Sequence, residues 1–129
     1  MLTGVWVARM NSITERWVRT LRGELLDRAL LARREVPTVP APVVAQSWSG
    51  SARQVQLARL LAGCDVEALD DGQARSVGAI AARAATTDIV DACVIEGAVR
   101  RGDLVVTSDP DDLQSIASAV GHQIEIDHP

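Results

Sequence analysis

Apolar residues in the first quarter of the chain repeat at the spacing of an amphipathic helix. Four of them recur at every fourth position and therefore lie on one helix face: Ile13, Trp17, Leu21 and Leu25. Ser12 and Glu15 have the spacing of a capping box at the start of this helix. Three prolines between residues 37 and 42 then break the pattern. The break predicts two units, an N-terminal amphipathic helical segment (residues 1–34) and a second domain (residues 35–129).

Beyond the prolines, segments typical of strands alternate with segments typical of helices. The pattern predicts strands over residues 64–69, 103–108 and 123–127. It predicts helices over residues 42–48, 53–62, 72–84, 88–101 and 110–119. Because strands that alternate with helices form right-handed βαβ units, we expect an α/β protein with a small parallel sheet.

Composition agrees with this fold and limits the function. Apolar residues make up 47% of the chain, and Phe and Tyr are absent, so the core must consist mainly of Val, Ile, Leu and Ala. The net charge of −4 argues against a general electrostatic attraction for nucleic acid. Cys64 and Cys93 lack metal-ligand spacing and are interpreted as reduced core residues. No apolar run reaches the roughly 20 residues of a membrane helix, so we expect a soluble, cytoplasmic protein with no membrane contact.

Acidic residues gather where two of the predicted helices begin. Asp88 and Asp91 open one helix, and Asp109 and Asp112 directly follow the strand that precedes the other. Since the carboxyl ends of parallel strands meet at one edge of a sheet, we expect these side chains to converge there. Carboxylate oxygens are the ligands that Mg²⁺ and Mn²⁺ prefer. The same residue types are also the ordinary caps and first-turn acids of helices, so spacing alone leaves both interpretations open.

Two segments resemble one nuclease family. Residues 85–113, ATTDIVDACVIEGAVRRGDLVVTSDPDDL, resemble the C-terminal half of a PIN domain, as in VapC-type toxins, and residues 38–61 resemble its second strand and following helices. The resemblance covers roughly residues 35–118. It implies a three-layer α/β/α fold and a Mg²⁺-dependent (or Mn²⁺-dependent) ribonuclease of a toxin–antitoxin pair. The implied partners are an RNA substrate, an antitoxin protein and a second copy of the chain.

The resemblance also assigns roles to individual residues. It implies that Asp91 and Asp109 are the catalytic, metal-binding carboxylates and that Asp88 and Asp112 are accessory metal ligands. Two polar residues stand where side chains commonly orient the site: Thr107 and Ser108. In this family the metal ion activates water for in-line attack on the RNA phosphodiester.

The sequence departs from the PIN pattern at two places. Gln46 stands where many members have Glu, and an amide is a poorer metal ligand than a carboxylate. A PIN domain also begins with a central strand that ends in an essential Asp. The closest counterpart here is the apolar run at residues 5–7 with the neutral Asn11 beyond it. We therefore expect an incomplete sheet that lacks its first strand, and weak or no activity.

The N-terminal segment resembles a different family. Residues 8–31, ARMNSITERWVRTLRGELLDRALL, resemble part of a DDE transposase or integrase core, with Asn11 and Glu15 in its N-x-x-x-E-R helix. That family's two catalytic Asp residues have no counterpart, so we interpret Glu15 as a helix cap. The hypothesis is a chimera of a transposase fragment and a PIN-like domain. Two alternatives to the nuclease stay open: a non-catalytic PIN-like protein that binds an antitoxin or itself, and a remnant of a DNA-binding transposition protein.

Two further sets of residues have structural and functional interpretations. The tryptophans at positions 6, 17 and 48 are dispersed, which favours core or interface anchors over a row of base-stacking rings. Arg100 and Arg101 end a predicted helix, where a cation is favourable in any case. We favour this structural role over contact with RNA phosphate.

Overall fold

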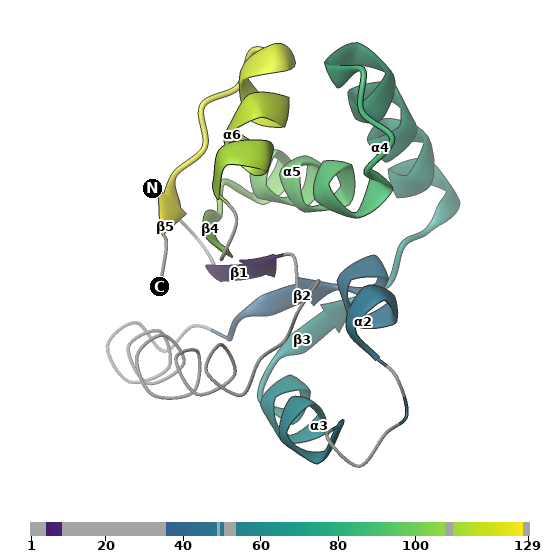
Figure 1. Ribbon diagram of the computed structural model, residues 1–129, viewed down its shortest axis with the longest axis vertical. Helices are drawn as coiled ribbons and strands as arrows, with labels where there is room; N and C mark the ends of the chain where they lie inside the picture. Colours follow the sequence, from purple (N-terminus) through teal and green to yellow (C-terminus); the bar gives the residue numbers. More distant parts are fainter. Residues whose placement is uncertain (1–4, 9–35, 49, 51–53, 108–109, 128–129) are drawn as a thin grey trace.

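The computed structural model describes residues 5–8, 36–48, 50, 54–107 and 110–127, and in these ranges strands and helices alternate (Figure 1). The strands are β1 (Val5–Ala8), β2 (Thr38–Pro40), β3 (Asp65–Glu67), β4 (Leu104–Thr107) and β5 (Ile126–Asp127). The helices are α2 (Ala41–Ser47), α3 (Gln54–Ala62), α4 (Asp71–Ala84), α5 (Ile89–Arg101) and α6 (Pro110–Ala119). The predicted α/β class is confirmed, and each described helix begins and ends within one residue of its prediction. The helix expected over residues 12–31 lies outside the described residues.

The strands form one parallel sheet in the order β3-β2-β1-β4-β5. β1 is its central strand, since Trp6 is in register with Thr38 of β2 on one side and Val105 of β4 on the other. The expectation of a sheet without a first, central strand is therefore wrong. The sequence left this strand unassigned because its short apolar run stands in a segment of mixed composition. The sheet also uses residues from both sides of the predicted boundary at 34/35.

Helices cover the sheet from two sides. In Figure 1, α4, α5 and α6 lie on one side of the sheet and α3 lies on the other. α5 packs across β1, β2 and β4 and is the most deeply buried helix. The main core lies between α5 and the central strands and contains fully buried aliphatic residues from these elements: Val39, Val94, Ile95, Val105 and Val106. The expected core of aliphatic side chains is thus confirmed for the described residues.

The pair α4–α5 has well-defined ends. α4 begins with a capping box in which the Asp70 side chain accepts from the Gln73 N–H at 2.7 Å and the Gln73 side chain accepts from the Asp70 N–H at 3.1 Å. α4 ends at Ala85 (φ 52°) and α5 ends at Gly102 (φ 69°), both in the left-handed conformation. A second apolar cluster joins the two helices: Val77, Ala81, Ala92 and Cys93. Within the described ranges, every helix is too short or too polar to cross a lipid bilayer.

Candidate functional site

The start of α5 is built around Asp88. Its carboxylate oxygen Oδ1 accepts a hydrogen bond from the backbone N–H of Asp91 at 3.0 Å, which makes Asp88 the N-cap of the helix. The hydroxyl oxygen of Thr86 accepts from the N–H of Asp88 at 3.1 Å and fixes the turn before it. The capping interpretation is therefore confirmed for Asp88. A carboxylate has two oxygens, so capping through Oδ1 does not prevent a metal contact.

Asp91 has a different environment. Its backbone N–H is capped, while its side chain is only 1% exposed in the first turn of α5. The positive end of the helix dipole favours a negative charge at this position. A buried carboxylate is costly unless a cation or hydrogen-bond donors compensate for the lost water. Asp91 is the most deeply buried carboxylate among the predicted site residues that the structure describes.

The other predicted site residues differ in burial, and two of them lie outside the described residues. Thr107 is fully buried at the end of β4, in register with Ala8 at the end of β1. Asp112 is exposed in the first turn of α6, and Gln46 is exposed on α2. Asp109 and Ser108 lie outside the described residues. The structure thus brings Asp88 and Asp91 together and does not test the expected approach of Asp109.

The oxygen donors at the start of α5 are of the chemical type that hard divalent cations prefer. Asp88 and Asp91 supply carboxylate oxygens, and Mg²⁺ in proteins is usually held by one or two carboxylates together with water. Over the part of the chain that the structure describes, no group of three or more His, Cys, Asp or Glu side chains is placed to hold a metal ion. Asp88 and Asp91 would therefore be the ligands from α5, and Asp109 would have to come from the segment between β4 and α6.

A second charged cluster was not predicted from the sequence. Glu67, at the end of β3, accepts hydrogen bonds from Arg100 at 2.7 Å and from Arg101. Glu96 also binds Arg100, at 2.8 Å, and Asp103 binds Arg101, at 3.0 Å. We call these five residues the Glu67 network. The Glu96–Arg100 spacing of four residues on a helix was a signal for one pair, but nothing local in the sequence indicates Glu67.

The network changes the properties of its cations. Hydrogen bonds from Arg100 to Glu96 and Glu67 raise the pKa of Arg100. Burial lowers the pKa of Arg101, although Glu67 and Asp103 oppose this effect. Both guanidinium groups bind carboxylates of the protein itself. This supports the structural interpretation of Arg100 and Arg101 over contact with RNA phosphate.

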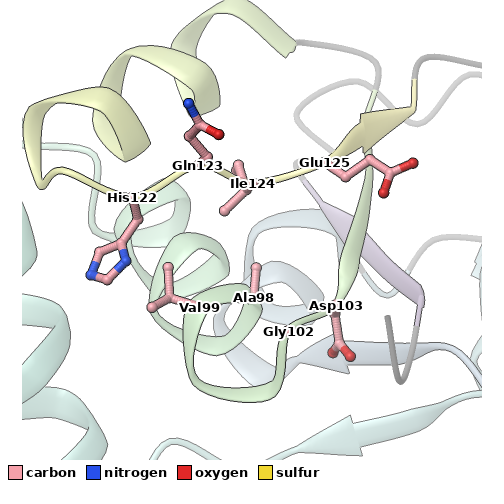
Figure 2. Close-up of a pocket in the computed structure, with 8 residues that line it drawn as sticks. All are labelled: Ala98, Val99, Gly102, Asp103, His122, Gln123, Ile124 and Glu125. Atoms are coloured by element: carbon pink, nitrogen blue, oxygen red, sulfur yellow. The ribbon is translucent and has the colours of Figure 1, made fainter. Parts of the chain in front are cut away.

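A hollow of about 440 Å³ lies between the end of α5 and the segment that joins α6 to β5 (Figure 2). Ile124 points toward Ala98 and Val99 across it, whereas the polar groups of Gln123 and Glu125 point in other directions. None of the predicted site residues lines this hollow. Its polar groups do not converge, so it offers no alternative catalytic centre.

Exposed apolar side chains are the remaining surface feature of note. Trp48, which follows α2, is 49% exposed, so its predicted role as a core anchor is wrong and an interface role stays a prediction. Trp6 lies in β1, and Trp17 lies outside the described residues. Other large apolar side chains on the surface come from separate elements: Val36, Val55, Val66, Leu69 and Ile89.

Comparison with known proteins adds no functional assignment to this geometry. No protein-family model matches the chain, and no curated protein shows significant similarity to it. The strand order and the residues at the start of α5 are therefore the observations from which a function can be proposed.

Proposed function

We propose that this chain is a PIN-type, Mg²⁺-dependent ribonuclease of the toxin–antitoxin kind with low activity. Its fold supports the proposal, because the resemblance implies a parallel sheet whose first strand is central. Here β1 lies between β2 and β4. The segment that resembles the family forms α5, β4 and α6 in sequence, the elements that the proposal requires.

The observation that carries the proposal is the burial of Asp91. Its carboxylate lies in the first turn of α5 with 1% of the residue exposed, while Asp88 performs the capping. Most acidic residues at helix starts stay in water, so burial of this one favours a cation-binding role. In the proposal Asp91 and Asp109 hold the ion, and Asp88 and Asp112 are accessory ligands.

A bound Mg²⁺ or Mn²⁺ would supply the Lewis acidity that lowers the pKa of water and stabilises charge on a phosphate. The residues of the chain would position the carboxylates that hold the ion. Asp88 fixes the first turn of α5 through its hydrogen bond to the Asp91 N–H, and that turn sets the position of the Asp91 carboxylate. Thr107, buried at the end of β4, precedes the segment that contains Asp109.

Two departures from the family pattern explain why low activity is proposed. β1 ends at Ala8 and is followed by Arg9, so no carboxylate stands where the resemblance expects an essential Asp. Gln46 provides an amide in place of a carboxylate. Each change removes one negative charge from the metal site, and affinity for a hard divalent cation falls with the number of charged ligands.

The same departures favour one alternative, a non-catalytic PIN-like protein that binds an antitoxin or a second copy of itself. Such a protein would have the same sheet but would not cleave RNA. The third candidate, a remnant of a DNA-binding transposition protein, depends on residues 8–31, nearly all of which lie outside the described residues.

A cleavage assay tests the proposal. Purified protein is incubated with end-labelled single-stranded RNA in EDTA, Mg²⁺ or Mn²⁺, beside the variants Asp91→Asn and Asp109→Asn. We expect cleavage only with the divalent ions and a loss of about tenfold or more in each variant, since even residues that merely support metal ligands typically cost about that factor when changed. Asp71→Asn is the matched control, because it removes the same charge from a side chain that is 81% exposed on α4.

The outcomes separate the candidates. Cleavage that persists in EDTA or survives both substitutions would come from a contaminating nuclease and would overturn the proposal. Absence of cleavage by the unmodified chain, together with a dimer in light scattering, would favour the non-catalytic alternative. Equal loss in Asp71→Asn would mean that lost charge, and not a specific site, reduces the rate.

A further inference from the structure

The edge strand β3 has few apolar contacts to hold it in place. It contains three residues, stands at the end of the sheet order and pairs with β2. Asp65 is exposed, and Val66 at the middle of the strand is 48% exposed. Its ladder begins with the hydrogen bond from the Asp65 N–H to the Pro37 carbonyl at 2.9 Å. Burial of apolar surface therefore contributes little to keeping this strand in the sheet.

Glu67 links this weakly held strand to the helical layer. Its Oε1 accepts from Arg100 at 2.7 Å and from the Gln73 side chain at 3.3 Å, and its Oε2 accepts from Arg101. These donors come from the end of α5 and the first turn of α4. One side chain thus joins β3 to two helices that follow it in the sequence.

The cations are held in place from the other side. Glu96 and Asp103, both buried, bind Arg100 at 2.8 Å and Arg101 at 3.0 Å. Both guanidinium groups are therefore held by a second carboxylate while they contact Glu67. Hydrogen bonds between charged groups that are already positioned are stronger than those of exposed, mobile ion pairs.

We propose that Glu67 is an electrostatic latch that fixes the edge strand β3 to the α4–α5 layer, and that β3 opens as a local unit when the latch is released. The main core consists of residues from α5, β2, β4 and α6 with helix α2, and β3 contributes none of its fully buried members. Local opening of an edge element without global unfolding is expected where apolar contacts are few.

Amide hydrogen exchange on the full chain tests the latch. Glu67→Gln keeps the size of the side chain and removes its charge, so both arginine contacts weaken. We expect the Asp65 amide, which donates to the Pro37 carbonyl, to exchange about tenfold faster or more, as for the loss of a charged hydrogen bond. The Val105 amide, which donates to the Glu125 carbonyl at 2.9 Å, should keep its rate. Asp71→Asn, which breaks the exposed pair with Arg75, is the control and should change neither rate.

Arg100→Gln provides a second test, because it removes one latch contact from the helix side. Faster exchange in β3 alone in both variants supports the latch. Equal acceleration at Asp65 and Val105 in both would show global destabilisation and overturn local opening. Unchanged exchange in β3 in both would show that the ladder to β2 holds the strand by itself. None of these outcomes depends on nuclease activity.

Discussion

At the scale of the residue, Ala85 is the described non-glycine residue with a positive φ, 52°. It ends α4 in the left-handed conformation, where a Cβ atom crowds the backbone and glycine is normally found. We expect Ala85→Gly to stabilise the fold by about 1 kcal/mol, since the strain relieved exceeds the added entropy of the unfolded chain. Urea unfolding followed by circular dichroism measures this change.

The reverse substitution at Gly121 is its control. Gly121 also has a positive φ, 77°, and a Cβ placed there would meet no atom within 4 Å. Gly121→Ala should therefore destabilise by about 1 kcal/mol through backbone strain alone. A neutral effect of both substitutions would show that neither turn is strained.

The ends of α4 and α5 show how far a single residue allows a helix stop to be predicted from the sequence. The helix stop at Gly102 was predictable because glycine is the common residue there. The end of α4 was predicted at the observed residue, although the alanine at its C-cap favours helix continuation. That turn is instead fixed by its neighbours, including the hydrogen bond from the Thr86 N–H to the Ala81 carbonyl at 3.0 Å.

At the scale of the element, substitutions of Asp88 at the N-terminus of α5 distinguish a capping role from a metal-binding role. Asp88→Ala removes the acceptor for the Asp91 N–H and should destabilise the protein by about 1 kcal/mol. Asp88→Asn keeps an acceptor oxygen and should retain nearly full stability. Thermal unfolding of both variants measures the cap.

The same pair of variants examines the proposed site. If Asp88 is an accessory metal ligand, Asp88→Asn should cleave RNA more slowly at low Mg²⁺ despite its stability. Stability and cleavage that are both unchanged in Asp88→Asn would leave capping as the sole role of this residue. A fall in stability as large as that of Asp88→Ala would contradict the cap geometry.

The helices and the strands β3, β4 and β5 were predictable at this scale, whereas β1 was not. Periods of 3.6 residues over the 13 residues of α5 or the 14 of α4 give a clear pattern. β1 has four residues and stands in a segment of mixed composition, so its apolar run gave no strand pattern, and β2 was expected only through the family resemblance. β1 is recognisable only through its pairing with strands 32 and 99 residues away, because tertiary hydrogen bonds and not local preference define it.

At the scale of the whole molecule, the two charged clusters differ in how far the sequence could predict them. Asp88 and Asp91 are three residues apart on one helix, so their proximity follows from helix geometry. Glu67 and Arg100 are separated by 33 residues and meet only because the fold brings β3 to the end of α5. Contacts of this kind depend on the complete topology, which is why the Glu67 network was missed.

The pH dependence of stability at alkaline pH is a further property of the whole fold. Burial, with Asp65 nearby, raises the pKa of Cys64 from 9.0 to about 11. Burial, with Glu96 and Glu67 nearby, raises the pKa of Cys93 to the same value. Between pH 9 and 11 the unfolded chain releases thiol protons that the folded chain retains. Stability therefore should be constant below the unfolded pKa and fall as pH rises toward the folded one, with a limiting slope of about 1.4 kcal/mol per pH unit for each buried thiol.

Urea unfolding at pH 8, 9, 10 and 11 measures this slope under reducing conditions. Cys93→Ala should flatten it, because the variant loses the titrating group while its small side chain stays apolar. Its stability at pH 8 should fall modestly through the lost packing of the sulfur between α4 and α5. A slope that is unchanged in Cys93→Ala would show that this thiol does not titrate differently in the folded state. The comparison isolates the thiol, because the arginines of the Glu67 network are the same in both chains. The thiol therefore reports on how well the α4–α5 interface excludes water.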